Sequence, residues 1–134
     1  MLAHDPGGFV EAALRAAWRG PGPLRPVALA EYVRALGDPD AIRAACEDYR
    51  AGATVDCAHE REDRARGRMI AAPTLLLWSA HGLVGRAFDP LEVWRGWCAD
   101  LRGEALDCGH FLPEERPREV GEALLGFMGA RGPG

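Results

Sequence analysis

Hydrophobic positions recur at helical spacing through the first half of the chain. Val10, Leu14 and Trp18 share one stripe and predict a first helix, which the glycines and prolines at positions 20–23 would end. A second helix is predicted by the stripe that contains Leu29, Tyr32, Val33 and Leu36. The first half of the chain is therefore expected to be wholly helical.

The third helix has the strongest local signals in the chain. Asp38 is placed to accept hydrogen bonds as an N-cap, and Pro39 suits the first helical position. Its apolar stripe continues through Ile42, Ala45, Cys46 and Tyr49. The alternating charges of residues 61–64 follow, and we interpret them as a solvated helix face or a linker.

The pattern changes near Gly67, after which strands and helices are predicted to alternate. Residues 73–78 are an apolar run without polar alternation, which is typical of a parallel strand covered on both faces. A loop with Gly82 and Gly85 follows, and Asp89 and Pro90 then indicate the start of a helix. That helix is predicted to face inward with Leu91, Trp94, Trp97, Cys98 and Leu101.

A short strand at residues 104–107 and a final helix from Pro117 complete a βαβα order. Two strands are too few for the sheet that the leucine run requires, because a central parallel strand pairs on both edges. We infer that the chain is the carboxyl-terminal portion of a larger fold or pairs with another polypeptide. The alternative is a helical first part packed directly over a two-stranded ribbon. We place the domain boundary between residues 1–66 and 67–134.

Composition restricts the classes of function. The chain has 134 residues and a formal net charge of −4, and its 16 basic residues are all arginine and form no one-sign patch, so nucleic-acid binding is not expected. The first residues lack the pattern of a secretory signal, and no apolar run is long enough for a membrane span, so a cytoplasmic protein is expected. The four cysteines lack metal-site spacing, and we expect no metal, disulfide or cofactor.

His110 is the candidate for chemistry. It follows Gly109 on a loop between the predicted last strand and the final helix. In open α/β sheets, ligands bind outside the carboxyl ends of the strands, so this position suits a working imidazole. A histidine that only caps or fills a turn is the alternative.

Several segments together resemble one family. They are the block Cys-Glu-Asp-Tyr-Arg-Ala from Cys46, Asp56, the pair His59 and Glu60, Gly67 with Arg68, Leu-Leu-Trp ending at Trp78, Trp-Arg-Gly-Trp from Trp94, and Cys-Gly-His-Phe-Leu-Pro-Glu-Glu from Cys108. In this order they resemble the carboxyl-terminal half of haloacetate (fluoroacetate) dehalogenases of the α/β-hydrolase fold. The resemblance extends over roughly residues 5–130. It implies a partial α/β-hydrolase fold, with a helical cap portion before the last two parallel strands and their helices.

The resemblance also implies roles for two residues. His110 matches the family's catalytic histidine, which activates water to hydrolyse the ester formed between an aspartate nucleophile and the α-carbon of a haloacid. Tyr49 matches a cap tyrosine that helps to hold the departing halide, and its ring is expected to rest on the apolar stripe of its helix. Without the resemblance, a core tyrosine would be the preferred interpretation.

Other parts of the family's site have no match in this chain. The nucleophile, the arginines for the substrate carboxylate, the oxyanion donors and the acid that orients the histidine all precede the matched segment in the family. We interpret Asp89 as a helix cap and Asp107 as too close in sequence to His110 to be its partner. Glu114 and Glu115 are interpreted as helix-entry residues. His81 is interpreted as a surface loop residue, and Trp78, Trp94 and Trp97 as core.

Three functions compete. The first is a fragment of a haloacetate dehalogenase-like hydrolase with a small haloacid substrate in the intact enzyme. The second is a fragment of an epoxide hydrolase, in which a cap tyrosine would protonate the epoxide oxygen. The third is a short binding or assembly module without catalysis. The chain alone is expected to be inactive, and its expected protein partners are a second copy or a complementing amino-terminal half.

Overall fold

A computed structural model describes residues 4–129, and the chain in it forms two compact units. The first unit takes the chain up to Ala16 and then Leu24–Arg68. The second unit takes Ala17–Pro23 and the chain from Met69 onward. The segment Ala17–Pro23 thus belongs with residues that lie far from it in the sequence.

The first unit contains helices only. They are α1 (Pro6–Ala17), α2 (Pro26–Leu36), α3 (Pro39–Ala53) and α4 (Val55–Ala65). The predicted cap of α3 is confirmed, because the Asp38 carboxylate accepts the Asp40 N–H at 2.8 Å and Pro39 occupies the first turn. Only Val10 and Leu14 of α1 are buried among the hydrophobic residues described in this unit.

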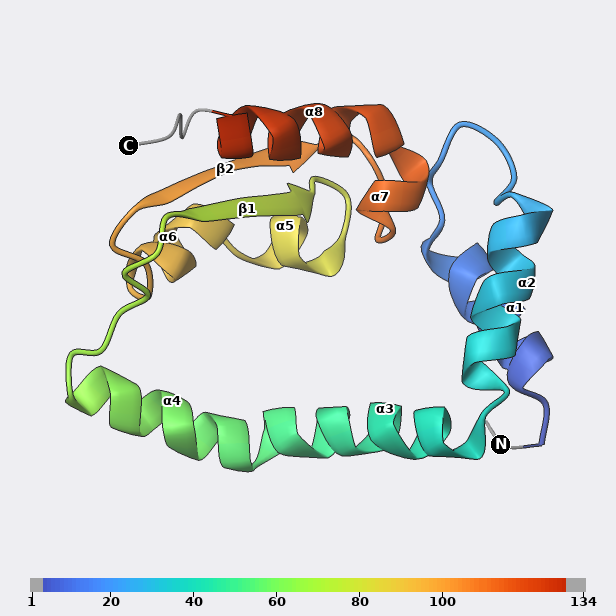
Figure 1. Ribbon diagram of the computed structural model, residues 1–134, viewed down its shortest axis with the longest axis horizontal. Coiled ribbons are helices and arrows are strands. Elements are labelled where there is room, and N and C mark those ends of the chain that lie inside the picture. The colour runs from blue at the N-terminus through green and yellow to red at the C-terminus, as the bar shows by residue number, and fades with distance from the viewer. Residues whose placement is uncertain (1–3, 130–134) are drawn as a thin grey trace. The chain divides into compact units, whose positions relative to one another are not determined.

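The second unit is built on two parallel strands. Its elements are β1 (Thr74–Ser79), α5 (Leu83–Ala87), α6 (Pro90–Arg95), β2 (Leu101–Leu106), α7 (Leu112–Glu115) and α8 (Pro117–Gly129). In the register of the parallel pair, Thr74 lies opposite Leu101 and Ser79 opposite Leu106. Figure 1 shows α8 on one side of the strands and α5 and α6 on the other. The predicted α/β class and the strand and helix order are confirmed.

Some predicted boundaries were wrong. The helix from Pro90 ends at Arg95, so Leu101 begins β2 instead of facing inward from that helix. The reason is that pairing between the two chain segments begins before the predicted strand. The Ile70 N–H donates to the Trp97 carbonyl at 2.7 Å, and the chain is extended from there, ahead of residue 104. A short helix, α5, occupies part of the predicted loop with Gly82 and Gly85.

The core of the second unit is small. Its buried hydrophobic side chains are Cys98, Leu106 and Cys108, whereas five of the six residues of β1 are only half-buried. Trp94 was predicted as core but is 38% exposed; it lies in the last turn of α6, which ends at Arg95. Within residues 4–129, no helix combines the length and apolar character that a membrane crossing requires.

Candidate functional site

The loops that follow β1 and β2 are joined by one buried hydroxyl group. Ser79, the last residue of β1, is 7% exposed, and its Oγ donates to the Cys108 carbonyl at 2.7 Å. The same Oγ accepts the N–H groups of Gly82 at 2.7 Å and His81 at 3.2 Å. The two loops at the carboxyl ends of the parallel strands are therefore fixed to each other at their bases.

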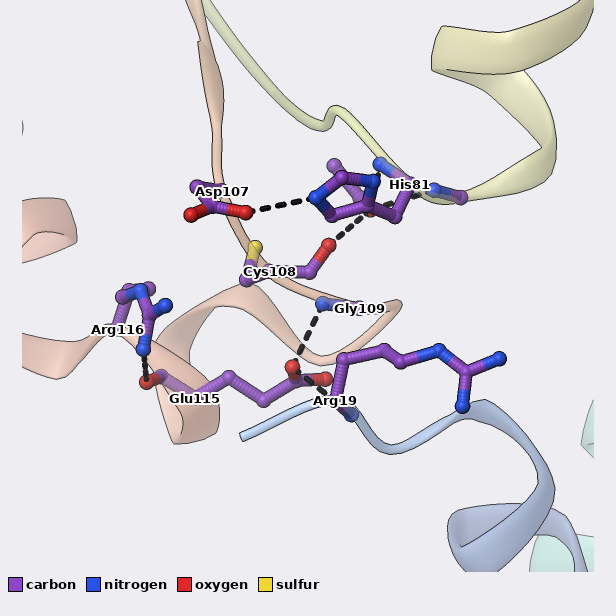
Figure 2. A network of polar contacts seen from close by, with 9 residues as sticks. Arg19, His81, Asp107, Cys108, Gly109, Glu115 and Arg116 are labelled. Carbon is purple, nitrogen blue, oxygen red and sulfur yellow. Dashed lines mark hydrogen bonds and ion pairs between the residues drawn. The ribbon is translucent and has the colours of Figure 1, made fainter. Parts of the chain in front are cut away.

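A buried carboxylate organises the loop that carries His110. Glu115 is 2% exposed, and it accepts the N–H groups of Gly109 at 2.6 Å, Phe111 at 3.2 Å and Arg19 at 3.1 Å. Figure 2 shows this carboxylate directed at the backbone of both Gly109 and Arg19. Since two of the donors flank His110, the Glu115 carboxylate fixes the backbone on both sides of the histidine.

His110 itself has a fixed backbone and an exposed side chain. Its N–H donates to the Ala17 carbonyl at 3.3 Å, and its ring meets the Phe111 ring edge-on with the centroids 5.0 Å apart. It follows the carboxyl end of β2, where the sequence placed it. The imidazole is thus open to solvent or to a substrate, and its catalytic role stays a prediction.

The position of Gly109 leaves no room for a side chain. A Cβ atom at this position would lie 2.5 Å from the Ala17 carbonyl oxygen and 2.7 Å from Oε1 of Glu115. Its φ is not among the positive values, which in the described chain occur at Gly22 and Gly67. The glycine in the Cys-Gly-His motif therefore allows Ala17–Pro23 to approach the histidine loop, and no left-handed conformation is involved.

Glu115 lies in the first turn of α7 and precedes α8, as expected for a helix-entry residue, but it also has a role that the sequence did not indicate. Glu115 is the last residue of α7 and binds backbone N–H groups outside that helix. Local sequence could not reveal this role, because one donor, Arg19, lies 96 residues away. The Glu-Glu pair after a Gly-His dipeptide was the only available signal.

A second contact at this edge was missed by the sequence analysis. Nε2 of His81 lies 2.7 Å from Oδ1 of Asp107, and the two side chains are 57% and 84% exposed. Asp107, which the sequence analysis did not assign to His110, is the partner of His81 in this contact. The register Ser79 opposite Leu106 places the residues that follow both strands side by side, so strand pairing would have predicted this contact.

Tyr49 lies in the first unit, near the end of α3. Its side chain is 83% exposed, so the expectation that its ring rests on the apolar stripe was wrong. Ile42 and Cys46 on the same stripe are half-buried, whereas the stripe loses its cover one turn later. The exposed phenol is available to a ligand, and a role in halide binding stays a prediction.

Two further observations concern the described residues. The thiol of Cys108 has a shifted pKa, and no group of side chains is arranged to hold a metal ion. Burial and the nearby Glu115 carboxylate raise the pKa of the Cys108 thiol above its ordinary value of 9.0. The thiol is therefore kept neutral and is a poor nucleophile. Among residues 4–129, no three His, Cys, Asp or Glu side chains group as metal ligands would.

No family model matches the chain. It is 32% identical to a fluoroacetate dehalogenase from Burkholderia sp over 130 residues, which is 96% of this chain and 42% of that protein. It is 31% identical to a soluble epoxide hydrolase from Corynebacterium sp. (strain C12), over 75% of this chain and 33% of that protein. The chain thus spans well under half the length of these curated relatives.

Solved structures of similar fold are also matched over part of their length. A Nostoc sp PCC 7120 protein assigned as an α/β hydrolase has a TM-score of 0.86 and 39% identity, over 95% of this chain and 43% of that one. A Pseudomonas aeruginosa protein assigned as an epoxide hydrolase, a t131d mutant with bound MFA, has a TM-score of 0.85 and 37% identity, over 96% and 43% of the two chains.

Proposed function

On the premise that the chain belongs to the α/β-hydrolase superfamily and carries part of its fold, we propose that it supplies the water-activating base of a hydrolase. The observation that carries the proposal is His110, whose backbone is fixed by Glu115 and Ala17 while its imidazole stays exposed at the carboxyl end of a parallel strand. A fixed, accessible imidazole is what general-base catalysis requires.

The proposed step is the hydrolysis of an ester between an aspartate outside this chain and the substrate. The imidazole of His110 takes a proton from water as the water oxygen bonds to the ester carbonyl carbon. The carbonyl–oxygen bond to the substrate then breaks, and the proton passes to the departing alkoxide. The aspartate side chain leaves as a carboxylic acid that holds the second proton of the water, and release of this proton to solvent regenerates the carboxylate. The product is an alcohol or hydroxy acid.

We further propose a small haloacid as the substrate. The similarity to the fluoroacetate dehalogenase extends over 96% of this chain, more than the 75% matched by the soluble epoxide hydrolase. The exposed phenol of Tyr49 would then donate its O–H to the departing halide. A hydrogen bond from a phenolic O–H stabilises an anion that forms beside it.

An epoxide is the second candidate substrate, favoured by the soluble epoxide hydrolase relative and by the Pseudomonas aeruginosa structure. Here the O–H of Tyr49 would protonate the oxygen of the opening ring. The base at His110 would act identically in both reactions, so the two candidates differ in the partner of Tyr49 alone.

The role of His110 can be tested in a chimera that carries this chain in place of the matching part of the Burkholderia enzyme. We expect His110→Gln to lower steady-state fluoride release from fluoroacetate by about 10²–10⁴-fold. One equivalent of covalent ester should still accumulate, which mass spectrometry of the intact protein would detect. His81→Gln, on the neighbouring loop, is the matched control and should change the rate by less than about threefold. Equal effects of both variants would overturn the assignment.

A second chimera tests the substrate. In it this chain replaces the matching part of the Corynebacterium epoxide hydrolase. We expect the dehalogenase chimera to retain the larger fraction of its parent's rate, and Tyr49→Phe to slow halide release in it. A larger retained fraction for epoxide opening would reject the haloacid in favour of the epoxide.

A further inference from the structure

The guanidinium group of Arg19 has no ion-pair partner among residues 4–129, although a buried carboxylate lies beside its backbone. The Glu115 carboxylate accepts the backbone N–H of Arg19 at 3.1 Å, and its other hydrogen bonds also go to backbone N–H groups. Arg15, one turn earlier in the chain, instead pairs with the Glu11 carboxylate at 2.5 Å. The exposed guanidinium of Arg19 is therefore left to an anion from outside the described chain.

The side chain of Arg19 begins directly against the loop that carries His110. A Cβ atom on Gly109, the residue before the histidine, would lie 2.9 Å from Cγ of Arg19. Oε2 of Glu115 accepts the N–H groups of both Arg19 and Gly109, and the Ala17 carbonyl accepts the His110 N–H at 3.3 Å. Figure 2 shows the Arg19 side chain extending away from the Glu115 carboxylate. The guanidinium and the imidazole are thus carried by two segments that are fixed to each other.

The segment that carries Arg19 is also held in shape by its own contacts. The indole N–H of Trp18 donates to the Gly22 carbonyl at 2.5 Å, and the Gly22 N–H donates to the Gly20 carbonyl at 2.9 Å. A Cβ atom on Gly20 would lie 2.4 Å from the Trp18 ring, so the ring packs closely over this turn. A charged group on a backbone that is already ordered loses less entropy when it binds a ligand.

We infer that Arg19 is a specificity residue that binds the carboxylate of an anionic substrate beside His110. A guanidinium presents its N–H groups in a plane that matches the two oxygens of a carboxylate. It also offsets the formal net charge of −4, which repels an anion from the chain as a whole. Arg19 is distinct from the arginines that the resemblance assigns to the carboxylate, because those precede the matched segment.

The inference rests on the proposed function of His110 and bears on the choice between the two candidate substrates. A haloacid carries a carboxylate that a guanidinium can bind, whereas an epoxide ring carries no negative charge. A role for Arg19 in substrate binding therefore favours the haloacid.

An acetate titration of the Burkholderia chimera, followed by NMR, tests the contact without requiring turnover. Acetate should shift the side-chain Nε–H signal of Arg19, and Arg19→Gln should raise the Kd for acetate by about 3–10-fold. Neutral acetamide, and sodium chloride at the same ionic strength, should leave the Arg19 signal in place. A response to acetate that matches the response to chloride would overturn the inference. For a chimera that does not fold, the same titration of the isolated chain decides, and a missing acetate-specific shift at Arg19 overturns the inference there too.

Steady-state kinetics of the chimera separate this inference from the role of His110. Arg19→Gln should raise KM for fluoroacetate by about 3–10-fold and change kcat by less than about twofold, and Arg19→Lys should recover part of the loss because it keeps the charge. Arg102→Gln, an exposed arginine on β2, is the matched control and should leave both constants unchanged. A lower kcat at constant KM in Arg19→Gln would contradict the inference.

Failure of the proposed function would give a different result. In that case His110→Gln would leave fluoride release unchanged, while acetate binding would still depend on Arg19. The opposite combination, a large effect of His110→Gln with acetate binding that does not respond to Arg19→Gln, would reject the role of Arg19 alone.

Discussion

The Glu115 carboxylate accepts the Gly109 N–H at 2.6 Å, so the residue before His110 is held by a side chain from the helix after it. The Glu115 carboxylate, which is almost fully buried, thus links the two ends of the loop that carries His110. A hydrogen bond to a buried charge is stronger than one between neutral groups, and leaving its donors unpaired is destabilising. The direction of His110 therefore depends on Glu115 as much as on the strand that precedes it.

Replacement of Glu115 should loosen the histidine loop. We expect Glu115→Ala to lower the free energy of unfolding by about 2–4 kcal/mol, because three backbone donors lose their acceptor. Glu115→Gln should have a smaller effect in the same direction, since the amide keeps one acceptor oxygen. Urea unfolding and amide exchange at Gly109 and Phe111 would measure both. Glu104→Gln, an exposed carboxylate on β2, is the control and should change stability by less than about 0.5 kcal/mol.

The packing at Gly109 predicts a second destabilising change. Gly109→Ala would push a methyl group to within 2.5 Å of the Ala17 carbonyl oxygen, and we expect a loss of about 1–3 kcal/mol. The control is Gly121→Ala in α8, where a Cβ atom would meet nothing within 4 Å. Alanine favours a helix, so that variant should gain about 0.5–1 kcal/mol. Thermal unfolding of the two variants should therefore shift in opposite directions.

The raised pKa of Cys108 predicts an alkaline loss of stability. In the folded chain, burial and the Glu115 charge keep the pKa above the ordinary value of 9.0 expected for the unfolded chain. The folded state then holds its proton to higher pH, so the contribution is complete below 9.0 and declines as pH rises through the folded value. Urea midpoints between about pH 7.5 and about pH 10.5 should fall, and Cys108→Ala should remove this part of the decline. An unchanged decline in Cys108→Ala would contradict the assignment.

Two contacts that join the same loops should differ in strength. The exposed His81–Asp107 pair should contribute less than about 1 kcal/mol, so Asp107→Asn should barely move the urea midpoint. Ser79→Ala removes a buried hydroxyl with three hydrogen-bond partners, and we expect a loss of about 1–3 kcal/mol. Equal losses of stability in Ser79→Ala and Asp107→Asn would contradict the conclusion that Ser79, and not the His81–Asp107 pair, holds the two loops together.

Elements with short-range signals were predictable from the sequence. Asp38 with Pro39 and Asp89 with Pro90 each specify a cap and a first turn within a few residues, and both start helices where expected. The leucine run likewise predicted a strand, and β1 occupies Thr74–Ser79, although five of its six residues are only half-buried. These features are formed by residues that are only a few positions apart, so the local sequence is sufficient to predict them.

Features that depend on distant partners were not predictable. The start of β2 is set by pairing with Thr74, and apolar spacing alone placed Leu101 on the preceding helix. The role of Glu115 depends on Arg19, and its position beside a helix start suggested an unrelated explanation. His110 was placed correctly because strand, glycine and helix adjoin it, whereas the exposure of Tyr49 follows from packing of the whole unit.

The bond between Arg19 and Glu115 also bears on how the chain folds. It closes a loop of 96 residues, and contacts of such long sequence separation form slowly because chain entropy opposes them. We therefore expect the segment Ala17–Pro23 to join the second unit after the strands and α7 have formed. The geometry around His110 would be among the last features to mature during folding and among the first lost when the chain begins to open.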